Sequence, residues 1–230
     1  MGIPRIYIDP GHSNIDPGAV GYVVERDLNE KVSKYMADYL LENYVCEVKV
    51  DPITNDDLGI IVKAANSWGA DLFVSNHFNS GGGDGYEGLV YNQARVALGE
   101  VFAKHVKATG QNLRMYGAAP GVKIRPDLHV LAYTNMPAII NEGAFVDNKN
   151  DIQDWDENAE LKKLGEAYAK AAAEYLKLEK KVKVSTKPIY RVFDAAGKQV
   201  GAYHEEANAF NEAKKQLSNK GSVKITLSDK

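Results

Sequence analysis

The sequence predicts an α/β fold: a mainly parallel twisted sheet flanked by helices on both faces, followed by a small C-terminal ββαβ module. Short apolar segments alternate with amphipathic helical segments over residues 1–178, a spacing typical of βαβ units. A polar and basic segment, residues 179–187, then interrupts this pattern. Strand and helix signals return on a smaller scale over residues 188–230. We therefore expect a domain of residues 1–178, a linker of residues 179–187 and a module of residues 188–230.

The elements of the first domain follow from local pattern. Helices are expected where apolar residues recur every three or four positions, and strands where short apolar runs end in turn residues. Asp27, with Glu30 three residues later, is typical of a helix start, and Gly69 is expected to end the second helix. The expected strands are residues 5–9, 45–50, 71–75, 87–91 and 138–142, and the expected helices begin at Asp27 and cover 58–69, 93–108 and 158–178.

The C-terminal module is predicted to contain two paired strands, a helix and a last strand. These elements are expected over residues 189–193, 199–203, 205–219 and 222–227. About 45 residues form only a marginal core on their own. We therefore expect this module to dock or to dimerise.

Composition is that of a soluble globular protein, with 230 residues, 44% apolar and 26% charged. No apolar run of about 18 residues is present, so membrane insertion is not expected. The N-terminus, Met1-Gly2-Ile3-Pro4-Arg5, lacks a signal-peptide pattern, which predicts synthesis in the cytoplasm without a leader. The single cysteine, Cys46, excludes an internal disulfide and a cysteine-based zinc site.

Charge is unevenly distributed along the chain. The net charge is −3, but residues 1–176 carry about −9 and residues 177–230 about +6. A basic tail on an acidic body indicates either an anionic binding partner or simply a solvated surface, and charge alone favours neither.

Three potential metal ligands lie where parallel strands end. His12 follows the first expected strand, and His77 and Glu142 end two later ones. The carboxyl ends of neighbouring parallel strands meet at one edge of a sheet, which Glu25, in the loop after His12, can also reach. Two imidazoles and one carboxylate leave a tetrahedral zinc ion an open position for water. The other carboxylate is then available as a general base.

At these residues the sequence resembles the zinc-dependent N-acetylmuramoyl-L-alanine amidases of the Amidase_3 type, over most of residues 4–178. The resemblance rests on five blocks in the family's order and spacing. They are Ile8-Asp9-Pro10-Gly11-His12, Asp16-Pro17-Gly18-Ala19, Glu25-Arg26-Asp27-Leu28-Asn29, Ser75-Asn76-His77-Phe78-Asn79 and Met136-Pro137-Ala138-Ile139-Ile140-Asn141-Glu142-Gly143-Ala144-Phe145-Val146-Asp147-Asn148.

The resemblance implies that the chain hydrolyses the amide between N-acetylmuramic acid and L-alanine in peptidoglycan. It implies that His12, Glu25 and His77 bind Zn²⁺ and that Glu142 is the catalytic carboxylate. Residues 121–131 look like the family's groove-lining stretch, so we expect Arg125 and His129 to contact substrate, together with Asn79 from the fourth block. The expected partner is peptidoglycan, not nucleic acid.

The C-terminal module resembles half of a SPOR-type repeat, a peptidoglycan-binding fold. The similarity lies in Val200-Gly201-Ala202-Tyr203, Asn208-Ala209, Ala213, Leu217 and Gly221. SPOR domains normally contain two such halves. A single half implies a homodimer or another wall-binding module, with anionic wall polymers as possible ligands, and a stabilising appendage is the alternative.

Several functions remain open from the sequence. The chain most resembles a phage endolysin, which reaches the wall once a holin opens the membrane, and a mother-cell lysis amidase of a spore former would look similar. A zinc peptidase that cuts within the stem peptide is the nearest rival. A catalytically silent wall-binding protein is a different class, and the presence of all four metal and base residues argues against it.

Overall fold

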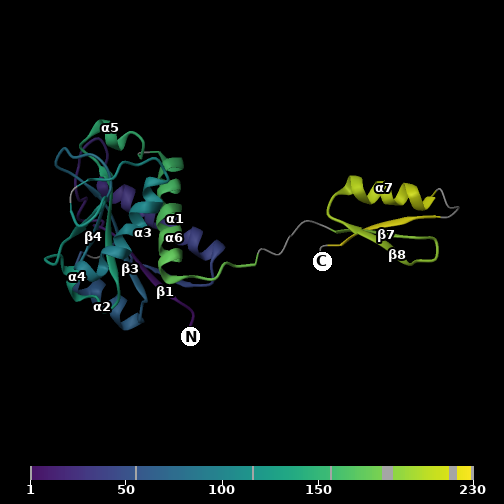
Figure 1. The fold of residues 1–230 in the computed structure, drawn as a ribbon, viewed down its shortest axis with the longest axis horizontal. Coiled ribbons are helices and arrows are strands. Elements are labelled where there is room, and N and C mark those ends of the chain that lie inside the picture. Colours follow the sequence, from purple (N-terminus) through teal and green to yellow (C-terminus); the bar gives the residue numbers. More distant parts are fainter. Residues whose placement is uncertain are drawn as a thin grey trace. The chain divides into compact units, whose positions relative to one another are not determined.

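The computed structural model describes residues 2–54, 56–115, 117–155, 157–182, 189–217 and 222–228. The chain forms two compact units, Met1–Lys181 and Val182–Lys230 (Figure 1). In the described part of the chain, every helix is too short or too polar to cross a membrane.

The first unit is built on a six-stranded sheet with helices on both faces, as the sequence predicts. The strand order is β2-β1-β3-β6-β4-β5. The first four of these strands are mutually parallel, whereas β4 pairs antiparallel with β6 and β5 pairs parallel with β4. The strands are β1 (Arg5–Pro10), β2 (Glu47–Val50), β3 (Leu72–Asn79), β4 (Glu87–Val90), β5 (Val122–Ile124) and β6 (Ala138–Phe145).

Three details of the sheet differ from the prediction. β3 runs four residues and β6 three residues further than expected, so His77 and Glu142 lie within strands and do not end them. β5 lies in a stretch with no predicted strand. Because β4 and β5 run opposite to the other four strands, their amino-terminal ends share an edge with the carboxyl ends of β3 and β6.

Two helical layers cover the sheet unequally. One face packs its apolar side chains, including Ile8, Val74 and Ile139, against α1 (Glu25–Asn43), α3 (Val96–Lys107) and α6 (Asn158–Leu176). The other face packs Tyr7 and Phe73 against the shorter α2 (Leu58–Trp68) and α4 (His129–Tyr133). Figure 1 shows α1, α3 and α6 together on one side and α2 and α4 on the other. The remaining helices are η1 (Gln93–Arg95) and α5 (Lys149–Ile152).

The short helices leave part of their face of the sheet open. Side chains two residues apart on a strand point to the same face. Asp9 therefore shares the face of Tyr7, and Ser75 and His77 share that of Phe73. Yet Asp9, Ser75 and His77 line a cavity, whereas Tyr7 and Phe73 are buried in the α2 and α4 core.

The helix ends show which local signals decide helix boundaries. α2 begins at Asp57, whose side chain accepts bonds from the backbone N–H groups of Gly59 and Ile60, and it ends at Gly69 in the left-handed conformation (φ 70°), as predicted. α1 begins at Glu25, two residues before the predicted Asp27, and its N-cap residue Val24 makes no side-chain bond.

The second unit is a three-stranded antiparallel sheet of order β8-β7-β9 with one helix packed on it. Its elements are β7 (Ile189–Phe193), β8 (Gln199–Tyr203), α7 (Glu206–Leu217) and β9 (Lys224–Ser228). Its fully buried apolar residues are only Val192, Ala209 and Ala213 among those described. Gly221 and the last two residues of the predicted helix lie outside the described residues.

The first unit extends slightly beyond the predicted domain end at residue 178. The backbone N–H of Val45 donates to the carbonyl of Glu179 at 2.8 Å, and that of Lys181 to Asn43 at 2.8 Å. Residues 179–181 thus pack on the end of α1. The remainder of the predicted linker, from residue 183, lies outside the described residues.

Candidate metal centre and active site

Three side chains with metal-binding atoms meet at the open part of the sheet. His12 follows β1, Glu25 is the first residue of α1 and His77 lies on β3. One ligand atom from each lies within 4.8 Å of the others. His12 Nε2 is 3.0 Å from Glu25 Oε2, and His77 Nδ1 is 2.8 Å from Glu25 Oε1. The two rings therefore face the same carboxylate from different elements.

Local backbone features hold His12 in place. His12 adopts the left-handed conformation (φ 67°), which is uncommon for a residue with a side chain. Asn29 on α1 donates to the carbonyl of Gly11 at 2.9 Å and so fixes the preceding turn. Asp16 Oδ2 lies 2.8 Å from His12 Nδ1, which leaves Nε2 directed at Glu25. A carboxylate on the outer nitrogen is the usual support of a metal-binding histidine.

Glycines make the close approach of the two rings possible. A Cβ on Gly11 would lie 2.2 Å from the His77 ring, and a Cβ on Gly18 would lie 2.4 Å from the His12 ring. Any other residue at either position would displace a ring. The Pro10-Gly11 and Pro17-Gly18 pairs of the sequence therefore shape this site.

The charges of the three residues depend on one another. Hydrogen bonding to Glu25 raises the pKa of His12 to about 9. Burial alone would raise the pKa of Glu25, but its bonds to His12 and His77 outweigh burial and hold that pKa far below its ordinary value. Burial opposes protonation of His77, yet Glu25 and Glu142 raise its pKa. The carboxylates that raise the pKa values of His12 and His77 would also attract a divalent cation to this cluster.

Glu142 lies beside this group without being part of it. On β6 it is the cross-strand neighbour of His77 on β3 and of Glu87 on β4. Burial raises the pKa of Glu142 to about 7, and the negative charges of Glu25 and Glu87 add to this effect while His77 opposes it. A carboxyl group with a pKa near neutrality can both accept and return a proton.

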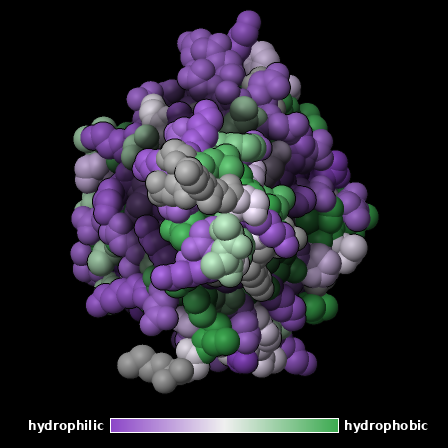
Figure 2. Space-filling model, turned by 90° about the vertical axis from the view of Figure 1, so that its right-hand side faces the viewer, coloured by the Kyte–Doolittle hydropathy of each residue, from purple (hydrophilic) through white to green (hydrophobic). Residues whose placement is uncertain are grey.

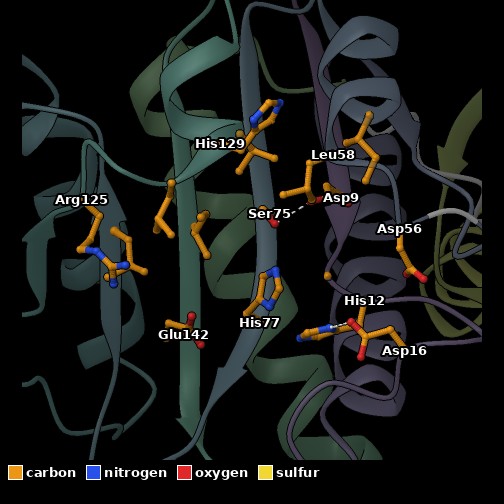
Figure 3. Close-up of a pocket in the computed structure, with 16 residues that line it drawn as sticks. Asp9, His12, Asp16, Asp56, Leu58, Ser75, His77, Arg125, His129 and Glu142 are labelled. Atoms are coloured by element: carbon orange, nitrogen blue, oxygen red, sulfur yellow. Dashed lines mark hydrogen bonds and ion pairs between the residues drawn. The ribbon is translucent and has the colours of Figure 1, made fainter.

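The predicted substrate contacts line the cavities around Glu142. The main cavity, of about 390 Å³, is lined by His12, His77, Glu142, Arg125 and His129 among others. Figure 3 shows Arg125 on one side of Glu142 and His77 and His12 on the other. Asn79 lines an adjoining hollow and does not line the main cavity.

Arg125, His129 and Asn79 are each held in place by a neighbouring side chain. Arg125 makes a two-pronged contact with Asp127, at 2.9 and 2.7 Å. The His129 ring packs on Tyr133 with 4.5 Å between ring centres. Asn79 donates to Glu87 Oε2 at 3.0 Å, so its amide supports a carboxylate at the cavity wall.

Two further groups were not singled out from the sequence. Asp9 is buried in the cavity wall, where its Oδ2 accepts a bond from Ser75 Oγ at 2.7 Å; it stands in the first of the five blocks, which is a signal that was available. Glu87 is buried and paired with Arg114, with 3.0 Å between Oε1 and Nε. The sequence around Arg114 has no pattern that indicates a functional role, because only the folding of the chain brings Arg114 next to Glu87.

Comparison with known proteins gives a consistent result. The family model Amidase_3, described as N-acetylmuramoyl-L-alanine amidase, matches residues 6–174. The sporulation-specific N-acetylmuramoyl-L-alanine amidase of Bacillus subtilis (strain 168) is 30% identical over 209 residues, which are 89% of this chain and 77% of that protein. The endolysin of Bacillus phage SPP1 is 32% identical over 182 residues, which are 76% of this chain and 67% of that protein.

A solved structure extends the similarity to three dimensions. The catalytic domain of CwlV, an N-acetylmuramoyl-L-alanine amidase from Bacillus (Paenibacillus) polymyxa var. colistinus, superposes with a TM-score of 0.69 at 27% identity. The superposition covers 77% of this chain and all of that domain.

Proposed function

The chain belongs to the Amidase_3 family of N-acetylmuramoyl-L-alanine amidases, enzymes of cell-wall hydrolysis, and from this we propose that it is a zinc enzyme whose catalytic carboxylate is Glu142. The bond cut is the amide between the lactyl group of N-acetylmuramic acid and L-alanine. One observation carries the assignment of roles: His12, Glu25 and His77 bring one ligand atom each to within 4.8 Å of one another, while Glu142, with a pKa of about 7, is the cross-strand neighbour of His77.

The residues present fit a catalytic zinc site. His12, His77 and Glu25 offer two nitrogens and one oxygen, the donor set of zinc sites that keep an open position, and Asp16 supports His12 from behind. When bound there, zinc supplies Lewis acidity, which polarises the scissile carbonyl and makes water more acidic.

The protein's own residues then perform the proton transfers. Glu142 accepts the proton of the attacking water, because at neutral pH its carboxylate form is available and it stands beside the ligand group. It returns that proton to the departing nitrogen of L-alanine, which otherwise leaves as an unstable anion. The buried ion pair of Glu87 and Arg114 holds the part of the cavity wall that neighbours Glu142.

The pH dependence of turnover tests Glu142 as the base. The base works only when it is deprotonated, so kcat/KM should fall as pH decreases through the pKa of Glu142, about 7 in the metal-free protein and lower beside a cation. Glu87→Gln removes a negative charge that raises this pKa, so it should move the acidic limb to lower pH. An acidic limb at the same pH in wild type and Glu87→Gln would contradict this role.

Digestion of purified peptidoglycan distinguishes the proposed reaction from its nearest rival. We expect mass analysis of the fragments to find a free lactyl carboxyl group and peptides that begin with L-alanine, and chelation to stop their release. Cleavage inside the stem peptide would instead identify a zinc peptidase. Wall binding without any cleavage would indicate a silent wall-binding protein.

We further propose that the enzyme serves cell-wall lysis. The relatives include both a phage endolysin and a sporulation-specific amidase, which are the two settings expected from the sequence. Both alignments extend beyond the family match at residues 6–174, and the proposed settings are phage lysis and, as the alternative, mother-cell lysis in a spore former.

The C-terminal unit is proposed to hold the enzyme on the wall, as its resemblance to half of a SPOR repeat suggests. β8 and β9 each pair on one side only within the described residues, so both edges are available for pairing with a second copy. Phe210, Leu217 and Leu227 of this unit are exposed apolar side chains. Figure 2 draws one face of the whole chain, on which apolar residues are interspersed with polar ones.

Truncation after Lys181 tests the role of this unit. We expect the full chain to sediment with purified walls and the truncated chain to bind far less, with binding that weakens as salt rises because exposed charges are screened beyond about 8 Å at physiological ionic strength. Light scattering should report at least a dimer for the full chain and a monomer for the truncated one. Equal wall binding by both chains would leave the unit as a stabilising appendage.

A further inference from the structure

The cavity continues past Glu142 into a second hollow, whose lining holds three cationic side chains, Arg114, Lys123 and Arg125, and two carboxylates, Glu87 and Glu142. This hollow, of about 250 Å³, lies on the side of Glu142 away from His12. It shares Leu89, Arg125 and Glu142 with the main cavity. The two therefore form one groove that crosses the sheet from α2 to β5.

Sheet register explains why the two ends of the groove differ. One row of neighbouring side chains runs across the strands through Asp9, Ser75, Ile140, Leu89 and Lys123. The row is apolar in its middle and ends in a cation on β5. Figure 3 shows Arg125 on one side of Glu142 and His77 and His12 on the opposite side.

Arg114 is held rigidly at the wall of the second hollow. Its guanidinium pairs with Glu87 at 3.0 Å and lies 4.7 Å above the centre of the Phe145 ring. Gly83 makes this position possible, because a Cβ there would lie 2.0 Å from the Arg114 Nη1 atom. Only 16% of the Arg114 side chain is exposed. A cation fixed in this way loses little conformational entropy when it binds an anion.

β5 and the residue after it supply two more cationic side chains to the same hollow. Lys123 and Arg125 are two residues apart, so they extend from the same face of the chain. Guanidinium groups bind carboxylates through two parallel hydrogen bonds. Arg125 already holds Asp127 in this way and Arg114 is paired with Glu87, so a substrate carboxylate would bind beside these acids or take the place of Asp127 on Arg125. The charges nearest the scissile bond lie on the peptide: in a muramoyl tripeptide, D-glutamate carries a free α-carboxylate and the third residue carries the C-terminal carboxylate.

We propose that this second hollow binds a carboxylate of the stem peptide and so sets the direction in which the substrate crosses the site. The inference rests on the proposed amidase function. The stem peptide then lies over β4 and β5, and the sugar lies toward α2 and α4, where Leu58, Ile61 and Val130 form an apolar wall. Lys123 and Arg125 are thereby specificity-determining residues.

The dimensions agree with this placement. β5 lies two strand positions from β6, which carries Glu142, and adjacent strands are about 4.8 Å apart. An extended peptide advances about 3.5 Å per residue, so the carboxylates of the second and third stem residues lie roughly 7–10 Å beyond the scissile bond. Either carboxylate reaches the side chains of Lys123 and Arg125.

Synthetic muramoyl tripeptides test the proposal with the full-length, metal-loaded enzyme. Three substrates are compared: one with both carboxylates free, one with the α-carboxyl of D-glutamate amidated, and one with the C-terminal carboxyl amidated. Loss of a charge-assisted bond should lower kcat/KM about 10- to 100-fold for whichever amidation removes the bound carboxylate. The amidated substrate with the lowered kcat/KM identifies which carboxylate the enzyme binds.

Variants connect that loss to the hollow. Lys123→Met and Arg125→Gln should cleave the free and amidated substrates at nearly equal, reduced rates, whereas Lys162→Met, an exposed lysine on α6, should keep the wild-type preference. Unchanged melting temperature and zinc content would exclude misfolding. A variant that retains the wild-type preference, or a wild-type enzyme that cleaves all three substrates alike, would overturn the proposal and leave the amidase function standing. A wild-type enzyme that cleaves neither these substrates nor walls would overturn the amidase function itself.

Discussion

Glu142→Gln is expected to lower kcat by about 10²–10⁴ while the protein keeps its zinc, because the substitution removes the proton acceptor and preserves the shape of the side chain. Glu142 is not one of the three clustered ligand residues, so metal affinity should change little. Metal analysis and turnover of the same preparation provide the measurement. Wild-type turnover in Glu142→Gln would place the base elsewhere.

The same substitution should stabilise the metal-free protein. Burial raises the pKa of Glu142 from 4.5 to about 7, so the folded state binds the proton more tightly than the unfolded state does. The stability of the wild type therefore decreases as pH rises from about 4.5 to 7, and above pH 7 the full cost of the buried charge is present. Glutamine avoids that cost, which is on the order of 3 kcal/mol.

Thermal unfolding with chelator present measures this effect. At pH 8 the melting temperature of Glu142→Gln should exceed that of the wild type, and at pH 4 the two should agree, because Glu142 is then protonated. Glu47→Gln is the matched control: Glu47 lies on β2 outside both cavities, and its loss should leave turnover unchanged. A lower melting temperature for Glu142→Gln at pH 8 would show that the charge contributes stability and is not merely tolerated for catalysis.

Periodicity predicted the longer helices and five of the six strands of the first unit, but neither the shortest elements nor the direction of all strands. The apolar pattern of residues 87–91 is the same whether the strand runs parallel or antiparallel to β6, so the reversal of β4 was not visible. β5 has three residues, too few for alternation to stand out. The start of α1 at Glu25 depends on tertiary contacts, since Glu25 faces both histidines and the N–H of Ala19.

The candidate site was predictable where its residues stand in short blocks and not where the fold assembles it. His12, Glu25, His77 and Glu142 belong to the family's blocks, and the structure brings the first three together beside the fourth. Arg114 comes from a loop with no distinctive pattern and reaches Glu87 by folding alone. The roles of His12, Glu25, His77 and Glu142 remain predictions. So do the substrate contacts at Asn79, Arg125 and His129.

Removal of the metal is expected to abolish turnover, and added Zn²⁺ to restore it. His12→Ala and His77→Ala should each lose the stoichiometric zinc, because either change leaves two of the three clustered ligands. His105→Gln is the matched control, since His105 lies on α3 and bonds to Glu174 at 2.8 Å, away from the cluster. It should retain both zinc and activity.

Proton release during zinc binding tests whether the ion occupies the ligand cluster itself. The pKa of His12 is raised to about 9 in the metal-free protein, so at pH 7 its ring is protonated and zinc must displace that proton. Titration calorimetry in buffers of different ionisation enthalpy should therefore find release of about one proton or more per ion at pH 7, and apparent affinity should fall as pH decreases. His12→Ala should release fewer protons from whatever weak binding remains. Full activity in metal-free protein, or tight zinc binding that releases no proton, would show that His12, Glu25 and His77 do not form the catalytic metal site.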